Sequence, residues 1–433
     1  MKLNVPTPVV PVQTHEGGAA RRINPEQQLR RSVMATMLWE DQFYEDGQEI
    51  AARIAEGVAK VKPEKIAEIA VEARTKGKLR HVPLLLCREL ARVGKLQAET
   101  LASVIQRADE LAEFLAIYWK DGKAPLSHQV KLGLAKAFTK FDAYSLAKYN
   151  RDGAIKLRDV LFLCHAKPKD EEQAALWKQL VDGKLESPDT WEVELSKGDK
   201  GKKESWERLL QEKKLFALAL LRNLRNMQQA GVDLELIRTA LAEMKTDRVL
   251  PFRFIAAARY APTLEPELEA AMFRCLAGAE KLGGETILLV DVSGSMDSAI
   301  SGKSDMRRID AAAALAILLR EISSCRVFTF SNQIVEVPPR RGFALRDAIV
   351  NSQPHGGTYL KAALTHIPAT QRLIVITDEQ SQDGATDAKA SLGYLLNVAS
   401  NRNGVGYAPW VHIDGFSESC VDWIREWERC EVN

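Results

Sequence analysis

The sequence predicts a two-part protein, in which an all-α region of successive helices is followed by a doubly wound α/β domain. Three observations predict this fold class. With 433 residues, the chain is too long for one ordinary core. Between residue 24 and about residue 283, apolar side chains recur at helical spacing. After Gly283 and Gly284, apolar strand segments alternate with helical segments, which is typical of a parallel sheet covered on both faces.

The helical region is predicted to begin at Asn24, a capping residue, with Pro25 at the first helical position. Helical segments then follow one another, separated by short turns with Gly, Pro or Asn. Helix pairs without a sharp sequence repeat favour an α-solenoid, and a closed helical bundle is the alternative. The clearest helical segments are "NPEQQLRRSVMATMLWEDQFY", "QEIAARIAEGVA", "PEKIAEIAVEART", "LRHVPLLLCRELARV", "AETLASVIQRADELAEFLAIYW", "KKLFALALLRNLRNMQQ" and "PELEAAMFRCLAGAEK".

The second region is predicted to alternate strands and helices in a regular order. Its first strand segment, "TILLVDVSGS", ends in a polar loop. We predict three domains or segments: a flexible N-terminal segment over 1–20, a helical domain over 21–282 and an α/β domain over 283–433. The predicted strand segments cover 286–295, 325–331, 372–380 and 410–414, and the predicted helices cover 308–322, 343–351, 358–367 and 419–430.

The composition is that of a globular protein without a membrane span. Hydrophobic residues make up 46% of the chain and charged residues 27%. No apolar run approaches the roughly 18 residues of a transmembrane helix, and the apolar stretch near the start is too short and broken for a signal peptide. The six cysteines are scattered without a Cys-x-x-Cys pair, which disfavours a zinc site. We therefore expect a cytoplasmic protein.

Oxygen-bearing side chains gather where the predicted strands end. Asp291, Ser293 and Ser295 occupy alternate positions just past the first strand, so their side chains can point the same way. Thr358 follows two glycines in "HGGTYL", and Asp378 ends a later strand. In a doubly wound sheet these positions meet at one edge. Two carboxylates and three hydroxyls are suitable ligands for Mg²⁺ or Mn²⁺, with an open coordination position.

This set of residues resembles the metal-ion-dependent adhesion site of a von Willebrand factor A domain. The resemblance implies that all five side chains contact the ion directly or through water, and that a carboxylate of a partner completes the shell. The neighbouring Asp297, Asp305 and Asp310 are expected to be solvated or to cap helices.

No sequence pattern indicates catalysis. The segment "GKSDM", residues 302–306, ends like a phosphate-binding loop, but Asp297 stands where such a loop has its first glycine, and no strand precedes it. A Gly-x-Ser-x-Gly elbow is also missing. We expect a surface loop at 302–306 and a protein that is not an enzyme.

Positive charge is concentrated in one part of the helical region. Residues 121–168 contain nine Lys or Arg and four Asp, an excess of five positive charges in a chain of net charge +2. Tyr144, Tyr149 and Phe141 are interleaved with them. Such a stretch is either a solvated helix face or a surface that binds RNA or DNA phosphates, with aromatic side chains available for stacking.

The segment "AKYNRDGAIKLRDVLFLCHAKP", followed by "ALALLRNLRNM" and the α/β domain, resembles the TROVE module of the Ro autoantigen family. The resemblance covers about residues 21–433, and bacterial Ro-like proteins are the more similar members. It implies a ring of HEAT-like helical repeats that a von Willebrand A domain closes, in a monomer. It also implies Y RNA on an outer basic face and single-stranded 3′ ends of misfolded RNA in the central hole. RNA quality control or degradation, with an exoribonuclease as protein partner, is implied in the same way.

By this resemblance, Lys148 and His165 fall on the positions that contact Y RNA. The family also has an arginine between them, whereas this chain has Asp152 at the aligned place and Arg151 beside it, so Arg151 is the candidate substitute. The other basic residues expected near the same face are Lys131, Lys140, Lys156, Arg158 and Lys167. The alternative function is that of a metal-dependent adhesion or scaffold module without RNA, in which the solenoid holds a polypeptide.

Overall fold

The protein is described here by a computed structural model covering residues 12–34, 38–41, 44–150, 153–186, 191, 201–246, 249, 251–399, 401–417 and 419–431. Helices fill the first part of the chain, and a sheet with its covering helices fills the second, as predicted. No helix among these residues has both the length and the hydropathy needed to cross a membrane.

The helical array begins as predicted. Helix α1 has Pro25 at its first position, and the Asn24 side chain accepts a 2.8 Å hydrogen bond from the Gln27 amide. The helices are α1 (Pro25–Met34), α2 (Gly47–Val58), α3 (Pro63–Thr75), α4 (His81–Arg92), α5 (Ala98–Val104), α6 (Asp109–Tyr118), α7 (His128–Phe138), α8 (Ala143–Tyr149), α9 (Leu157–Cys164), α10 (Glu171–Val181), α12 (Lys202–Gln211), α13 (Ala217–Gln229), α14 (Leu234–Glu243), α15 (Pro251–Tyr260) and α16 (Glu265–Leu276), with a short 3-10 turn at Pro262–Leu264.

The array has two hydrophobic cores. Helices α1 to α10 share one core, in which Ile54, Phe114 and Phe138 are fully buried. Helices α12 to α16 belong to a second core, which continues without a break into one face of the sheet. Successive helices pack on their neighbours, as α3 does on α4 and α7 on α9, which is the packing of an α-solenoid.

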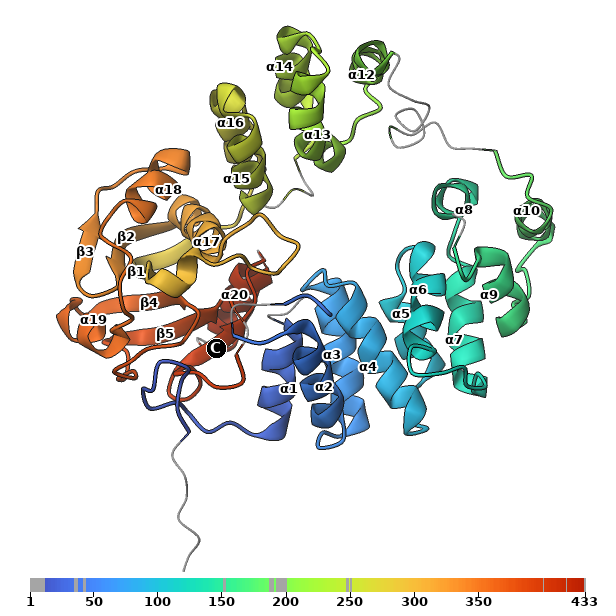
Figure 1. Cartoon of the computed structure of the whole chain (residues 1–433). Helices are drawn as coiled ribbons and strands as arrows, with labels where there is room; N and C mark the ends of the chain where they lie inside the picture. The colour runs from blue at the N-terminus through green and yellow to red at the C-terminus, as the bar shows by residue number, and fades with distance from the viewer. Residues whose placement is uncertain are drawn as a thin grey trace, which may run out of the picture.

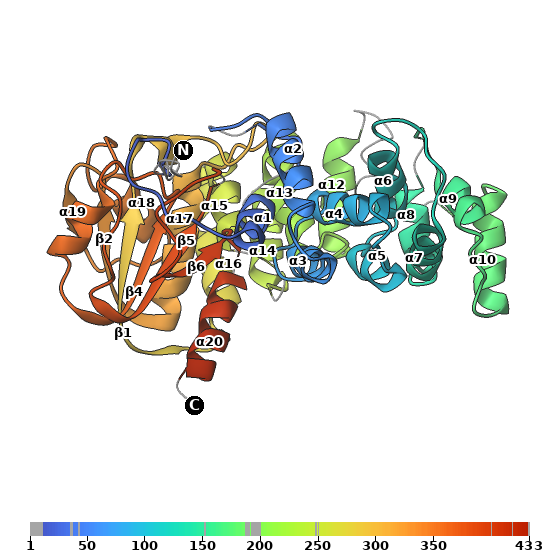
Figure 2. The same ribbon diagram turned by 90° about the horizontal axis from the view of Figure 1, so that it is seen from below.

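The described elements are arranged in a ring (Figure 1). Helix α1 contacts strand β6 of the α/β unit, and at the other end of the array α15 contacts α17 and α16 contacts α18. Turned by 90°, the array is a flat band rather than a rising superhelix (Figure 2). Both ends of the array therefore meet the same α/β unit.

The α/β unit is a six-stranded sheet with the order β3-β2-β1-β4-β5-β6. All neighbouring strands are parallel except β2 and β3, which are antiparallel. Strands β3 and β5 were not predicted. The elements are β1 (Leu282–Asp291), a 3-10 turn at Gly294–Asp297, α17 (Arg308–Ile322), β2 (Ser323–Phe330), β3 (Ile334–Val337), α18 (Gly342–Val350), α19 (Leu360–His366), β4 (Thr370–Thr377), β5 (Ala390–Asn397), β6 (Val411–Asp414) and α20 (Ser419–Glu431).

The strands are buried on both faces because helices cover both sides, as predicted. Leu288 and Val290 of β1 face α17 and α20, whereas Ile287 and Leu289 face α19. This alternation is the period of two along a strand. The carboxyl ends of β1 and β4 lie side by side in this arrangement, because these strands pair directly.

The expectation of a flexible segment over 1–20 is corrected for residues 12–20. The hydroxyl of Thr14 donates a 2.9 Å hydrogen bond to the Ser381 carbonyl, and Gln13 pairs with Ala19 in an isolated bridge. A Cβ on Gly18 would approach the Ser381 carbonyl oxygen within 2.2 Å, so only glycine allows this close packing. Residues 12–20 are therefore packed on the α/β unit.

Candidate metal centre and basic helical face

The last residue of β1, Asp291, is fully buried at the carboxyl edge of the sheet. Its Oδ1 accepts a 2.9 Å hydrogen bond from the Ser293 amide, and its Oδ2 accepts a 2.6 Å bond from the hydroxyl of Thr377, the last residue of β4. These two bonds fix the orientation of the carboxylate at the edge where ligands of doubly wound folds bind.

Two serines connect Asp291 to the second predicted carboxylate. The hydroxyl oxygens of Ser293 and Ser295 are 3.3 Å apart. The Ser295 hydroxyl donates a 2.6 Å hydrogen bond to Oδ2 of Asp378, the residue that follows β4. Four of the five predicted metal ligands therefore lie within one continuous set of hydrogen bonds.

Thr358 reaches the same edge on a separate loop. The Gly294 amide donates a 2.9 Å bond to the carbonyl of Gly356, which draws this loop against the serine loop. The Thr358 carbonyl accepts a bond of the same length from the Gln382 amide, and the residue is buried. The structure thus brings all five predicted residues to one edge of the sheet.

The site suits a hard divalent cation. Burial, and secondly the charge of Asp378, raise the pKa of Asp291 to about 7. Ionisation of both carboxylates is therefore unfavourable in the absence of a cation. The five side chains offer only oxygen ligands, which Mg²⁺ and Mn²⁺ prefer. The described residues contain no group of three or more His, Cys, Asp or Glu that could hold a metal, so an ion at this edge depends on the hydroxyls.

The three neighbouring carboxylates have other partners. Asp310 caps α17, because its Oδ2 accepts a 2.7 Å bond from the Arg307 amide. Asp297 is 2.5 Å from Nδ1 of His355 and also pairs with the Arg307 guanidinium. Asp305 accepts a hydrogen bond from a tyrosine of α15. The expectation of a helix cap is confirmed for Asp310.

Two residues that the sequence did not indicate also contact the metal centre. The hydroxyl of Tyr44, which precedes α2, donates a 2.6 Å hydrogen bond to Asp378 Oδ2. Arg308 of α17 is fully buried, 3.1 Å from the same oxygen, and its guanidinium lies 4.6 Å from the centre of the Tyr44 ring. One oxygen of Asp378 is therefore already bonded to a residue of the helical part of the chain.

Replacing Tyr44 by phenylalanine is expected to raise the affinity for Mg²⁺. The Tyr44 hydroxyl donates a hydrogen bond to an oxygen of Asp378 that would otherwise bind the ion or its bound water. A hydrogen bond to a charged group contributes about 1.5 kcal/mol or more. We expect a gain of about tenfold, measured by isothermal titration calorimetry. The control Y144F changes a half-exposed tyrosine of α8. Equal affinities of Y44F and Y144F would show that Tyr44 does not compete with the ion.

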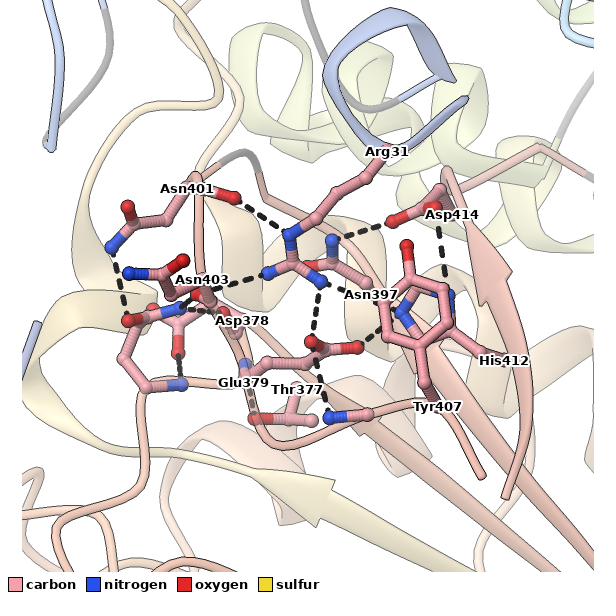
Figure 3. A network of polar contacts seen from close by, with 12 residues as sticks. Arg31, Thr377, Asp378, Glu379, Asn397, Asn401, Asn403, Tyr407, His412 and Asp414 are labelled. Carbon is pink, nitrogen blue, oxygen red and sulfur yellow. Dashed lines mark hydrogen bonds and ion pairs between the residues drawn. The ribbon is translucent and has the colours of Figure 1, made fainter. Parts of the chain in front are cut away.

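A buried ionic network adjoins the metal centre and joins it to α1 (Figure 3). Arg31 of α1 forms a 2.5 Å ion pair with Glu379, the residue after Asp378, and donates a 2.6 Å hydrogen bond to the Asn401 carbonyl. His412 contacts the other oxygen of Glu379. Arg31 and Glu379 are both fully buried. The first helix is thus attached to the residue next to Asp378, a predicted metal ligand.

Opposite charges in this network stabilise the ionised forms of its buried side chains. Burial alone would raise the pKa of Glu379, but Arg31 and His412 lower it to about 2. Burial alone would lower the pKa of His412, whereas Asp414 and Glu379 raise it above its usual value. Glu379 is therefore ionised at neutral pH, inside the contact between the helical array and the α/β unit.

The predicted RNA-contacting residues lie at one end of the first half of the array. Lys148 is in the last turn of α8, His165 follows the end of α9, and both helices pack on α10 (Figure 1). The Lys148 ammonium lies 5.8 Å from the ring of Tyr144 and 5.9 Å from that of Tyr149. Exposed residues of the predicted face are His165, Arg158 and Lys167, and half-exposed ones are Lys131, Lys148 and Lys156.

Two further residues of the predicted face are Lys140, which is hydrogen-bonded to α5, and Arg151. The Lys140 ammonium donates hydrogen bonds to the carbonyls of Ala102 and Ile105, the latter at 3.1 Å. Its pKa is lowered by burial. The Lys140 side chain therefore contacts the carboxyl end of α5, although the residue as a whole is exposed. Arg151 lies outside the described residues, as does Asp152.

His165 has a structural role in addition to its exposed ring. Its backbone is in the left-handed conformation, with φ 52°, and its amide donates a 3.3 Å hydrogen bond to the Phe162 carbonyl. This backbone ends α9. The imidazole projects from a fixed helix end beside Phe162, whose side chain is 60% exposed.

Comparisons with known proteins agree with this organisation. Residues 177–277 match the family model of the TROVE domain, and residues 286–382 match that of the von Willebrand factor type A domain. The crystal structure of the Ro (RSR) protein of Deinococcus radiodurans is similar, with 17% sequence identity and a TM-score of 0.57. The similarity covers 90% of this chain and 96% of that chain. Two segments of the chain therefore match the two predicted kinds of domain in the predicted order, and the chain shares its fold with this solved structure.

Proposed function

We propose that this protein binds non-coding RNA and is not an enzyme. The support is that the chain matches the TROVE domain and then the von Willebrand factor type A domain, on the fold of a Ro protein. Small structured RNA of the Y RNA type binds the basic face of α7 to α9, and single-stranded 3′ ends of misfolded RNA enter the ring. The protein acts as a cytoplasmic, monomeric ring in RNA quality control or degradation, with an exoribonuclease as partner.

One observation carries this proposal: Lys148 and His165, separated by sixteen residues of sequence, belong to two helices that pack on the same neighbour. Helices α7 to α9 and their ends carry further exposed or half-exposed basic side chains, and the Lys148 ammonium lies 5.8 Å from the half-exposed ring of Tyr144. Cations placed on one face neutralise phosphates and release counterions, which gives a strongly salt-dependent affinity. Such contacts position a folded RNA by its backbone shape rather than by its base sequence.

The metal centre has a structural role in this proposal. Its ligands lie next to Glu379, which holds α1, and Asp378 itself accepts the hydrogen bond of Tyr44. The five ligand side chains would hold the ion and fix the loops that contact the helical array. A bound divalent ion would supply positive charge between two buried carboxylates. Single-ion geometry with three hydroxyl ligands is unlike the two-metal sites of nucleases, which supports a protein that is not an enzyme.

The alternative function is a metal-dependent adhesion or scaffold protein. In that case binding of the partner would require the divalent ion and would respond little to monovalent salt. RNA binding would instead weaken steeply with NaCl and survive EDTA. If the protein cleaved labelled RNA in the presence of Mg²⁺ and Asp291→Ala abolished the cleavage, both functions would be contradicted and a nuclease would be indicated.

The double variant K148A/H165A is expected to bind a structured Y-type RNA more weakly, with the circular dichroism spectrum unchanged. Loss of one lysine–phosphate contact should also lower the slope of log affinity against log salt by about one. The measurement is a gel-shift titration at several NaCl concentrations. The matched control is K361A/H366A, which removes the same side chains from exposed positions of α19 on the α/β unit. Equal affinity of the two double variants would refute the assignment of this face.

A further inference from the structure

Three hydrogen-bond donors meet one oxygen of Asp378. Its Oδ2 accepts 2.6 Å bonds from the hydroxyls of Tyr44 and Ser295, and an Arg308 guanidinium nitrogen lies 3.1 Å away. A carboxylate oxygen offers roughly two lone pairs, so these donors leave no acceptor capacity at this atom. The other oxygen, Oδ1, accepts the backbone amide of Gln380. Because Oδ2 is the oxygen bonded to a predicted metal ligand, an ion at the metal centre, or its bound water, must displace a donor there.

Tyr44 is the donor that leaves at the lowest cost. Ser295 is itself a predicted ligand, so its hydroxyl oxygen would turn toward the ion. Arg308 belongs to α17 and has no exposed surface, so withdrawing it from Asp378 would separate two buried opposite charges. Tyr44 is half-buried and lies outside a helix, in the stretch that precedes α2. Its departure removes one hydrogen bond and no charge.

The Tyr44 hydroxyl keeps its proton at neutral pH. Burial, and secondly the negative charge of Asp378, raise the pKa of Tyr44 above the usual tyrosine value. The hydroxyl is therefore a neutral donor whose hydrogen is directed at the oxygen that the ion needs. Tyr44 and an ion at the metal centre exclude each other from Asp378.

The residues around Tyr44 form a contact of their own with the α/β unit. We call residues 38–41 and 44–46 the cap segment. The Gly302 amide donates a 2.7 Å hydrogen bond to the Asp41 carbonyl, and the buried Ser301 hydroxyl donates to the Glu40 carboxylate. Gly302 and Ser301 lie on the loop 298–307, between the metal centre and α17. The cap segment is thus held at Asp378 and at this loop together.

We propose that the cap segment and a divalent ion compete for Oδ2 of Asp378, so that ion binding releases Tyr44 and loosens the cap segment from the loop 298–307. Coupling between two binding events is reciprocal, so the factor by which Tyr44 weakens ion binding is also the factor by which the ion weakens the cap contact. The Arg31–Glu379 ion pair does not involve Oδ2, so α1 stays attached. The proposal goes beyond the RNA-binding function and does not depend on it.

Hydrogen–deuterium exchange of the full chain, followed by mass spectrometry of peptides that span the cap segment and the loop 298–307, tests the release. Saturating Mg²⁺ should speed exchange of these peptides about tenfold relative to EDTA, because exchange follows the opening of local contacts. In Y44F the same peptides should exchange fast without Mg²⁺ and respond little to it. In Asp291→Asn, which is expected to lose the ion, Mg²⁺ should have no effect.

A second measurement weakens the cap segment at a residue that is not a predicted ligand. Ser301→Ala removes the bond to Glu40, so the ion should bind about fivefold more tightly in calorimetric titration with Mg²⁺. The matched control is Ser304→Ala. It removes a hydroxyl of the same loop that accepts the Met306 amide, and it should leave the affinity unchanged.

Slower exchange of the cap segment with Mg²⁺ would overturn the proposal, because the ion would then hold the segment in place. Equal Mg²⁺ affinities of Ser301→Ala and Ser304→Ala would overturn it as well, and so would a failure of the parent chain to bind the ion. None of these outcomes depends on RNA, so they leave the gel-shift test of the basic face of α7 to α9 unaffected.

Discussion

Replacing Arg31 by methionine is expected to release α1 from the α/β unit. Arg31 has no exposed surface, and it pairs with Glu379 and donates to two backbone carbonyls (Figure 3). Its removal leaves the buried Glu379 carboxylate with His412 and the Gly406 amide as partners but without its arginine, and breaking one side of a buried ion pair costs about 3–5 kcal/mol. The free energy of unfolding from a urea titration should fall by that amount, and small-angle scattering should show an expanded particle.

The neighbouring residue provides the control for this prediction. Arg30 pairs with Glu72 at 2.7 Å, but both side chains are partly exposed, so Arg30→Met should cost less than about 1 kcal/mol. Adding Glu379→Gln to Arg31→Met should recover part of the loss, because it removes the unpaired charge. Equal stability of the Arg31→Met and Arg30→Met variants would show that this network does not hold the ring closed.

Asp291→Asn is expected to abolish binding of the divalent ion. Asp291 is a buried carboxylate at the centre of the site, and an amide keeps its size and an oxygen acceptor for the Ser293 amide but removes the charge. Because even indirect partners of metal ligands contribute 10- to 100-fold to affinity, we expect a loss of about a hundredfold or more. Calorimetric titration with Mg²⁺, and electron paramagnetic resonance with Mn²⁺, would measure it.

Asp297→Asn is the matched control for the metal centre. Asp297 is a nearby carboxylate that pairs with His355 and Arg307, so the ion should bind this variant as it binds the parent chain. A structured RNA should bind Asp291→Asn normally, since the basic face lies on α7 to α9. Undiminished Mg²⁺ affinity in Asp291→Asn would show that the predicted metal centre does not bind the ion.

The alternation of strands and helices was sufficient to predict most of the α/β unit, and two strands show where it was not. Strand β3 is a four-residue antiparallel edge, too short for a periodic pattern. Strand β5 contains Gly393, which reads as a strand breaker in the sequence. A Cβ at Gly393 would approach the Cβ of Ala388 within 2.7 Å, so the glycine is required by packing that only the folded chain reveals.

The positions of the five predicted metal ligands could be inferred from the sequence because strand ends and their loops fix them locally. Tyr44, Arg308 and Arg31 were not, because each acts on residues remote in sequence: Tyr44 and Asp378 are 334 positions apart, and Arg31 and Glu379 are 348 apart. Lys140 shows a different case, since its place in a basic stretch predicted an exposed charge, and the residue is exposed, but its ammonium also donates a hydrogen bond to the end of α5. Charge counted along the chain does not reveal which cations the fold itself uses.

Sequencing of the RNA that co-purifies with the protein from its native cells would test directly whether the helical ring binds RNA. We expect enrichment of small structured non-coding RNAs and of misfolded transcripts with unpaired 3′ ends, with less of the former in K148A/H165A. Recovery of no RNA above that of an unrelated protein of equal charge would contradict this expectation.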